Sequence, residues 1–333
     1  MRLTTLIIAF AAMAPVLGQP VPDYGLDWRT IGDPGNVAAQ PADYFWLQVM
    51  EFGPVGRVDY EFRMNQFEMT NGRWVEFVDS YTRANPAANV SDLSLTGLSV
   101  RRSSDDPQNY GWYAIPGTEN VAVEIGWFSA ARYANWLHNG KVTASWAFET
   151  GAYDMSSFYQ LPGGLWEGNS QHLPGALFWL PSWDEWTKSM HWDPNKSGPG
   201  QGGYWLYPHS SDSRPVTGLP GEPGAQTSGG LWPNVQYPIP VGSYPNSQSP
   251  WGLLDGSGGS SEYLGYWVDG VPDTRGSNRG LSPSHWDRLD YLGTTGFPDL
   301  PMATFRLASV VPSPVTLIVL VLIPFRRRRT CVE

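Results

Sequence analysis

Residues 240–265 read PVGSYPNSQSPWGLLDGSGGSSEYLG, and this stretch decides how the rest of the chain is interpreted. Its glycines and prolines exclude a regular helix and limit any strand to a few residues. Several of its side chains are large and apolar: Trp251, Leu253, Leu254, Tyr263 and Leu264. Because such side chains do not suit a solvated linker, we expect a long ordered loop that packs into a folded domain.

Three segments that precede this loop in the chain carry the apolar periodicity of amphipathic helices. They cover residues 70–81, 129–137 and 182–190. Thr70 and Ser129 are expected to cap the first two helices, and Asn139-Gly140 is expected to end the second. Ser182 and Glu185 predict a capping box at the start of the third. A loose apolar alternation between residues 44 and 67 predicts two strands around a turn.

The composition is that of a globular protein rich in aromatic residues. Trp, Tyr and Phe make up 14% of the 333 residues, and 37 Gly and 30 Pro accompany them. This balance favours a loop-rich fold held together by aromatic side chains over a helical bundle. The formal charge of -10 argues against nucleic acid as a partner, because nucleic-acid binding needs a basic surface. The same charge suits cations, neutral glycans and basic proteins.

Motifs in the same order along the chain resemble the formylglycine-generating (sulfatase-modifying factor) family. Residues 65–77, NQFEMTNGRWVEF, are similar to the family's K-Y-E-V-T-N-x-x-Y-x-x-F, and 179–186, WLPSWDEW, to its R-L-P-T-E-A-E-W. Residues 240–265 resemble the family's central loop, and 303–308, ATFRLA, its closing G-F-R-x-A. The resemblance spans residues 44–308. It implies one α+β domain with the variant C-type-lectin-like fold, loop-rich, with short strands and two or three helices.

The resemblance also bears on metals. Glu262 takes the place of a glutamate that helps the family to bind calcium, but Gly259 replaces the asparagine of that site. Glu262 with backbone carbonyls would form a weak calcium site, and the alternative is a packed glycine-rich loop without a metal. Catalytic members hold copper through cysteine thiolates, whereas residues 275–305 contain no cysteine and the single cysteine is Cys331. Since thiolate is the soft ligand that suits copper(I), we expect neither copper nor the family's oxidase activity.

Both ends of the chain have the composition of targeting segments. Residues 1–18 join an arginine to a short apolar run and small residues, which is the pattern of a secretory signal peptide. Residues 19–43 form an expected entry arm before the domain at 44–308. Residues 309–333 combine prolines, an apolar stretch and four arginines, and resemble the PEP-CTERM sorting tail that an exosortase-type transpeptidase processes. We expect an exported protein, at the outer surface or extracellular, that this tail anchors transiently in the membrane; an unrelated tail anchor would give the same topology.

The expected function is that of a non-catalytic scaffold that binds an extracellular glycan, a matrix polymer or a protein. Large aromatic side chains are the candidates for ligand contact, because indole and phenol rings stack on sugar faces and anchor interfaces. These candidates are Trp205, Tyr207, Trp232, Trp251 and Trp267. Each of them would also fit the core of the domain.

Two alternative functions stay open. The first is a metal-dependent oxidase that modifies exported proteins through a non-cysteine site, for which Glu262 and His285 are the candidate residues. The second is a purely structural envelope protein. The sequence has no His-x-x-x-His spacing, no Gly-x-Ser-x-Gly elbow and no phosphate loop. A bound redox metal with oxygen consumption would favour the oxidase, and retention on extracellular polymer would favour the scaffold.

Overall fold

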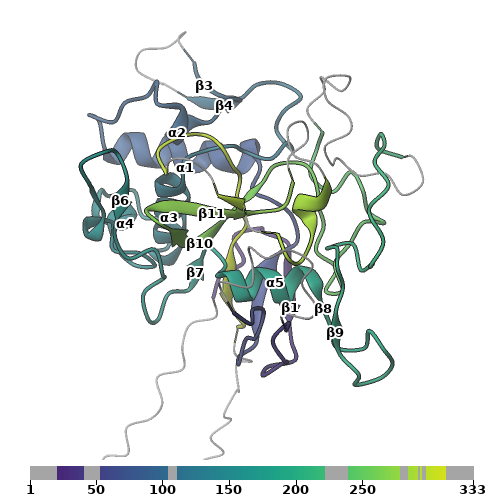
Figure 1. Ribbon diagram of the computed structural model, residues 1–333. Coiled ribbons are helices and arrows are strands. Elements are labelled where there is room, and N and C mark those ends of the chain that lie inside the picture. The colour runs from purple at the N-terminus through teal and green to yellow at the C-terminus, as the bar shows by residue number, and fades with distance from the viewer. Residues whose placement is uncertain are drawn as a thin grey trace, which may run out of the picture. The chain divides into compact units, whose positions relative to one another are not determined.

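Two of the three main helices begin at the residues that the sequence predicted (Figure 1). α1 (Asn71–Ala84) follows Thr70, whose side chain accepts a hydrogen bond from a backbone N–H of the first turn at 3.4 Å. α5 (Trp183–His191) begins with the expected capping box, in which the Ser182 and Glu185 side chains each accept the other's backbone N–H. The predictions made from these capping residues are confirmed.

The computed structural model describes residues 21–40, 53–103, 111–221, 239–277, 284–291, 293–294 and 298–312. Asp23–Val311 forms one compact unit. The expected signal peptide and nearly all of the expected sorting tail lie outside the described residues. No helix within the described ranges is both long enough and apolar enough to cross a membrane.

Replacing Ser182 with alanine removes half of the capping box, so we expect the free energy of unfolding to fall by about 1 kcal/mol. Urea denaturation measures the change. Ser91→Ala is the matched control, because Ser91 is exposed and caps no helix; its effect should stay within about 0.5 kcal/mol. Equal midpoints for the two variants would contradict the capping role.

α3 (Trp127–His138) begins before Ser129, so the prediction that Ser129 caps it is wrong. Its N-cap is Gly126, which makes no side-chain hydrogen bond. The backbone there is held by a neighbouring segment instead, because the Gly126 N–H donates to the Ser94 carbonyl at 2.8 Å. A Cβ at Gly126 would also lie 2.8 Å from a backbone carbonyl oxygen. The helix ends at Asn139, as predicted.

Antiparallel sheets accompany these helices. The largest has four strands in the order β1-β2-β13-β7, and the next has three in the order β10-β11-β12. The first consists of β1 (Trp28–Ile31), β2 (Phe62–Asn65), β13 (Ala308–Val310) and β7 (Phe178–Trp179). The second consists of β10 (Glu262–Val268), β11 (Val271–Arg275) and β12 (Gly293–Thr294).

Shorter elements accompany the two larger sheets. The described part of the chain contains three two-stranded ribbons: β3 (Val100–Arg102) with β4 (Trp112–Ala114), β5 (Tyr159–Gln160) with β6 (Trp166–Glu167), and β8 (Trp192–Asp193) with β9 (Gly203–Tyr204). The short helices are α2 (Leu93–Thr96), α4 (Trp146–Glu149) and the 3-10 turns η3 (Met155–Ser157) and η4 (Ser284–Asp287). This mixture of helices and small antiparallel sheets is the expected α+β class.

The sheet also shows where the folded unit begins. β1 lies inside residues 19–43, the expected entry arm, and pairs with β2 from Trp28↔Asn65 to Ile31↔Phe62. Part of that arm therefore belongs to the sheet. Of the two strands expected between residues 44 and 67, β2 is the second, and the place of the first falls mostly outside the described residues.

The core between α1 and α3 is built from aromatic side chains. Trp74 and Phe77 of α1 lie 5.3 Å and 5.4 Å from Tyr133 of α3, measured between ring centroids. Phe305, from the closing segment, meets Trp74 edge-on at 5.7 Å. All four are at most 3% exposed. These large rings bury enough apolar area to hold together a chain with little regular structure.

Candidate functional site

The central stretch 240–265 is an irregular loop that becomes β10 at Glu262. Leu253 and Leu254 are at most 6% exposed, and Tyr263 and Leu264 are fully buried. The prediction of an ordered loop packed by its own side chains is confirmed. The loop places Glu262, the predicted calcium residue, in the interior.

Protein donors occupy both carboxylate oxygens of Glu262. Arg306 donates from Nη2 to Oε1 at 2.5 Å and from Nε to Oε2 at 2.6 Å, and the indole N–H of Trp186 donates to Oε2 at 2.9 Å. The side chains of Arg306 and Glu262 are 0% and 1% exposed. Arg306 also donates to the carbonyls of Leu254 and Asn65. The ion pair therefore ties the central loop to β2 and to the closing segment.

Two further buried carboxyl groups lie close to this ion pair. Burial, with the charges of Asp255 and Glu262, raises the pKa of Glu68 well above its usual value. Burial also raises the pKa of Asp255 to about 6, although the Gly242 N–H that it accepts at 2.7 Å favours the charged form. The single guanidinium of Arg306 thus lies near three carboxyl groups. Glu68 and Asp255, the two outside the ion pair, retain their protons more readily than in water.

A metal would have to compete with these contacts. Within the described residues, no group of three or more His, Cys, Asp or Glu side chains is arranged to hold a metal ion. A calcium role of Glu262 stays a prediction, and the ion would have to displace Arg306 or Trp186 from the same oxygens.

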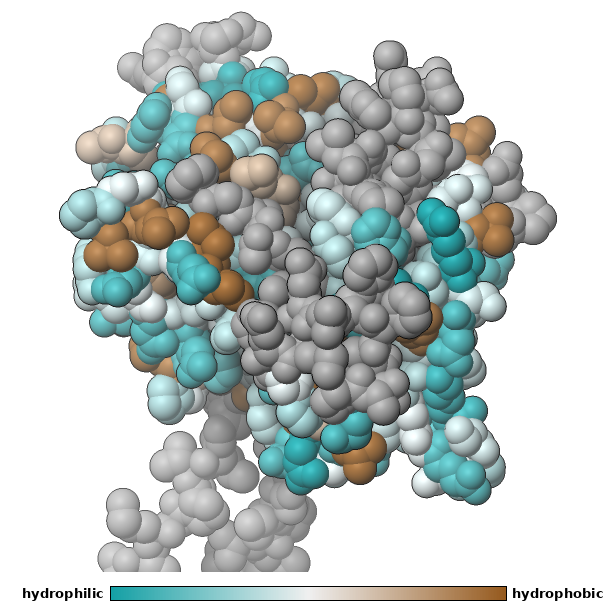
Figure 2. Space-filling view, in the orientation of Figure 1, coloured by the Kyte–Doolittle hydropathy of each residue, from teal (hydrophilic) through white to brown (hydrophobic). Residues whose placement is uncertain are grey.

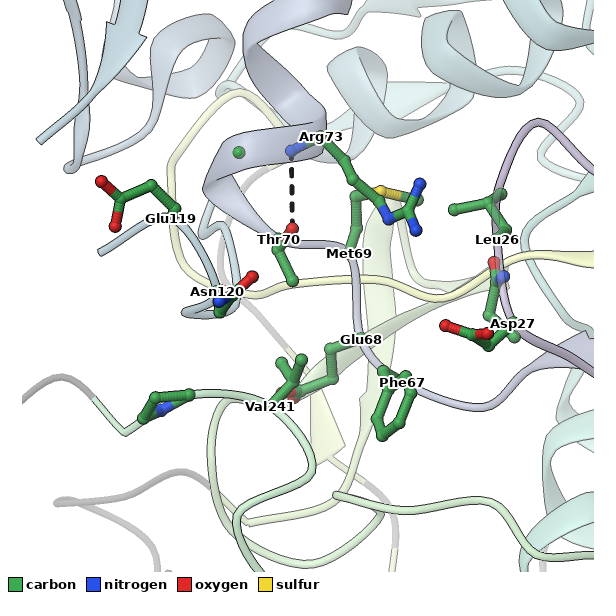
Figure 3. A pocket seen from close by; sticks show the side chains of 13 residues that line it. Leu26, Asp27, Phe67, Glu68, Met69, Thr70, Arg73, Glu119, Asn120 and Val241 are labelled. Carbon is green, nitrogen blue, oxygen red and sulfur yellow. Dashed lines mark hydrogen bonds between the residues drawn. The ribbon is translucent and has the colours of Figure 1, made fainter. Parts of the chain in front are cut away.

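A cavity of about 440 Å³ lies between the β2–α1 corner and the start of the central loop. Glu68 lines it from the corner, and Val241 lines it from the loop. Figure 3 shows Arg73 and Asp27 on one side of this cavity and Glu119 on the other. Its walls carry charges of both signs, which suits a polar ligand that has groups of both kinds.

Trp267 of β10 belongs to a cluster of half-buried aromatic side chains, which we call the aromatic face (Phe128, Phe158, Trp166 and Trp267). Phe158 lies 5.2 Å from Trp267 and 5.3 Å from Phe128, and Phe128 lies 4.8 Å from Trp166, measured between ring centroids. The buried Trp127 meets Trp267 edge-on at 5.0 Å. Four packed rings that stay partly open to solvent form an apolar platform on the surface.

A cavity of about 350 Å³ adjoins the aromatic face, with Phe128, Phe158 and Trp166 in its wall. Its polar lining consists of Asn89, Asp92, Ser94, Ser129, Arg132 and Asp299. Arg132 is held in place by Glu149 through two hydrogen bonds of 2.7 Å and 3.1 Å. Figure 2 shows hydrophobic surface on the left of the view, in the region of β6 and α4.

The other predicted contact residues do not join this face. Trp205 is half-buried, with the ammonium of Lys196 4.5 Å from its ring centroid. Tyr207 is 6% exposed, and Trp251 is half-buried. No ring contact within the described residues links Trp205, Tyr207 or Trp251 to the aromatic face. Trp232 lies outside the described residues.

The segment that would carry the family's cysteines takes part in a hydrogen-bonded network. The backbone N–H of Ser277 donates to Asp287 at 2.7 Å, and the Ser257 hydroxyl donates to the same carboxylate. Burial raises the pKa of Asp287 to about 6. His285 is exposed, whereas Glu262 is buried in its ion pair, so the two candidate residues of an oxidase site stand in different environments.

The family of the chain follows from a comparison with known proteins. The family described as "Sulfatase-modifying factor enzyme 1-like domain" matches residues 34–286, which is more than half of the chain. The chain belongs to the FGE-sulfatase family. A comparison with curated proteins returns no match.

Solved structures resemble this FGE-sulfatase domain at low sequence identity. CarF aligns with a TM-score of 0.48 and 16% identity, over 86% of this chain and 99% of CarF. PvdO from Pseudomonas aeruginosa aligns with a TM-score of 0.45 and 13% identity, over 88% of this chain and 100% of PvdO. Treponema denticola variable protein 1 aligns with a TM-score of 0.45 and 12% identity, over 85% and 94% of the two chains.

Three residues of the aromatic face in this FGE-sulfatase domain are not among the contact residues that the sequence predicted. A signal existed for Phe128, because it falls outside the apolar stripe of α3 formed by residues 130, 133, 134 and 137. An aromatic ring on another side of the helix needs a second partner. Phe158 directly precedes β5 and Trp166 belongs to the two-residue strand β6, so neither carries a periodic signal in the sequence and only the fold reveals their contacts.

Proposed function

We propose that this FGE-sulfatase domain is a non-catalytic binding domain of an exported protein, and that the aromatic face binds an extracellular glycan. The observation that carries the proposal is the partial exposure of four mutually packed aromatic rings beside a cavity with polar walls. Rings in a core are shielded on all sides, whereas these keep part of their surface open to a ligand.

The chemistry of the cavity suits a sugar. A pyranose ring presents C–H groups that pack on aromatic faces, and its hydroxyls need donors and acceptors beside those faces. Asn89 and Asp299 supply acceptors at the cavity, and Arg132 supplies a donor that Glu149 already orients. Matrix polymers built from sugars offer the same groups in repeated form.

The absence of cysteine supports a non-catalytic role. Residues 275–305 contain no thiolate to hold copper. Ser277 and Asp287, which lie in that segment, bond each other. The same proposal includes export through the signal peptide at 1–18 and transient anchoring by the tail at 309–333, with an exosortase-type enzyme as the processing partner.

Affinity electrophoresis of the full-length chain through gels that contain neutral polysaccharides tests the binding role. We expect retention by at least one polymer, and Trp166→Ala should weaken it about tenfold, because a lost stacking contact costs roughly 1.4 kcal/mol. Tyr113→Ala is the matched control, since Tyr113 is 45% exposed but lies outside the aromatic face. Equal retention of the two variants, or no retention of the wild type by any polymer, would contradict the proposal. Thermal melting shows whether each variant is folded.

Two measurements on the same purified protein test the oxidase alternative. Metal analysis is combined with oxygen uptake in the presence of a cysteine-containing sulfatase peptide. We expect no turnover. Stoichiometric copper or iron together with turnover would overturn the non-catalytic proposal, and variants of His285 and Glu262 would then be the first to examine.

A further inference from the structure

β10 carries a β-bulge that directs neighbouring side chains to different surfaces. Tyr263 pairs with Thr274 and Trp267 pairs with Pro272, so β10 uses more residues than β11 over the same distance. At the bulge, the Gly265 N–H donates at 2.9 Å to a carbonyl of the segment that precedes α5. An ideal Cβ on Gly265 would lie 2.8 Å from a carbonyl oxygen of that segment, so the close approach requires glycine. The bulge therefore fixes β10 against the start of α5.

Tyr266, which follows Gly265 in the bulge, lines a cavity of about 470 Å³ at the start of α5. Tyr60, His172 and Trp183 supply three more rings. Tyr60 is 48% exposed and Tyr266 is half-buried, so these two offer open ring surface, whereas Trp183 is 6% exposed and closes the inner wall. The cavity shares no described lining residue with the cavity beside the aromatic face.

The two carboxyl groups of this cavity stand beside the neutral polar side chains of Gln171 and Ser182 and the ring of His172. Asp184 and Glu185 carry these carboxyl groups, and none of the described lining residues of the cavity is Lys or Arg. Glu185 is fully engaged, because it accepts from the Tyr60 hydroxyl at 2.9 Å, from the Trp179 indole at 3.0 Å and from a backbone N–H at 2.7 Å. Its carboxylate therefore serves to hold the Tyr60 ring in the wall.

Asp184 keeps one oxygen available. Its Oδ1 accepts the Gly56 N–H at 2.6 Å, while no donor in the described part of the chain reaches Oδ2. Burial and the neighbouring Glu185 raise the pKa of Asp184, which is the behaviour of a carboxylate that lacks a cation. The N-terminus of α5 adds only about half of a positive charge, part of which the capping box satisfies, so two carboxylates leave the cavity negative.

We propose that the cavity formed by Tyr60, Trp183, Asp184 and Tyr266 binds the ammonium group of a lysine side chain from a basic protein partner. The open rings of Tyr60 and Tyr266 attract a cation through their faces. The free Oδ2 of Asp184 accepts one of its N–H groups, and the apolar walls take up the aliphatic stem. The proposal stands independently of glycan binding, since the two cavities have different linings.

The geometry favours lysine over arginine. A guanidinium binds best when two carboxylate oxygens accept in parallel, and Oδ1 of Asp184 is already occupied by Gly56. An ammonium needs only one charged acceptor. The formal charge of -10 on the chain also attracts a basic partner over distance, which speeds association at low salt.

Isothermal titration of the full-length chain with a lysine-containing peptide tests the proposal, together with the same peptide acetylated on its lysine. We expect the unmodified peptide to bind at least about tenfold more tightly than the acetylated peptide. An arginine peptide should bind more weakly than the lysine peptide, and n-butylammonium should compete with it. Equal binding of the acetylated and unmodified peptides, or no binding of either, would overturn the proposal.

Two variants place the interaction in the cavity. Asp184→Asn keeps an acceptor for the Gly56 N–H but removes the charge, so peptide affinity should fall about tenfold while polysaccharide retention is unchanged. Tyr266→Leu removes the ring at similar volume and should weaken binding severalfold. Asp154→Asn is the control, because Asp154 is exposed and outside the cavity. Unchanged peptide affinity in both Asp184→Asn and Tyr266→Leu would overturn the assignment of lysine binding to this cavity. A loss of polysaccharide retention with unchanged peptide affinity would contradict only the glycan-binding proposal for the aromatic face.

Discussion

Replacing Arg306 with methionine is expected to lower the free energy of unfolding by about 3–5 kcal/mol, because it leaves the buried carboxylate of Glu262 without its cation. The effect should lie at the upper end of that range. Glu68 and Asp255 stand close by, and the charge of Arg306 is one of the contacts that lower the pKa of each. Urea denaturation of the full-length chain measures the loss.

An exposed ion pair provides the control for this change. Arg57 and Asp59 lie 2.7 Å apart with side chains 53% and 68% exposed, so Arg57→Met should cost less than about 1 kcal/mol. Adding Glu262→Gln to Arg306→Met should recover part of the loss, because it removes the stranded charge. A cost below about 1 kcal/mol for Arg306→Met would show that the buried pair does not stabilise the fold.

The contribution of Asp273 to the free energy of unfolding is expected to fall as the pH rises from about 4 to about 8. Burial raises the pKa of Asp273 from 3.8 to about 8, and its Oδ2 accepts no hydrogen bond in the described residues. Between these two values the folded chain holds a proton that the unfolded chain has released, so the free energy of unfolding declines with pH. At about 1.4 kcal/mol for each pKa unit, the contribution is on the order of 5 kcal/mol.

Asp273→Asn should remove most of this slope, because an amide resembles the protonated acid and does not titrate. We expect the variant to be more stable than the wild type at pH 8 and nearly equal to it at pH 4, as measured by chemical denaturation across the range. Asp269→Asn, at the exposed turn between β10 and β11, should leave the profile unchanged. Asp255 and Asp287, with pKa values of about 6, contribute slopes of the same sign, whereas His191, whose pKa burial lowers to about 3, contributes a slope of the opposite sign that the variant retains. Parallel profiles for wild type and Asp273→Asn would contradict the prediction.

Local chemistry made the helices and the central loop predictable from the sequence. The side chains of Thr70 and Ser182 reach backbone groups only three residues away, so their capping roles are visible in a short window. Leu253 and Leu254 marked the loop as buried. The start of α3 was not predictable in this way, because Gly126 is held by the Ser94 carbonyl, which lies far back in the chain.

The candidate sites depend on contacts between distant segments. Arg306 and Glu262 are 44 positions apart. The sequence around Glu262 does not indicate that Arg306 will donate to both of its carboxylate oxygens. Trp267 was a candidate on residue type alone, and its packing against Phe158 follows from the arrangement of β10 and the loop before β5. Side-chain periodicity carries no information on such pairs, so the sequence indicated the kind of residue but not the surface that the residues share.

The position of β13 sets the order in which the fold can be completed. It is the last strand of the described chain, yet it lies between β2 and β7, with Ala308 opposite both Met64 and Trp179. As the chain emerges from the ribosome, β2 and β7 therefore have no common neighbour until almost all of the domain has been made. Closing a sheet over such a long sequence separation is slow, and the nascent chain presents two unpaired strand edges in the meantime. The four-stranded sheet can therefore be completed only at the end of synthesis. A chain that stops before residue 308 lacks the strand that joins β2 to β7.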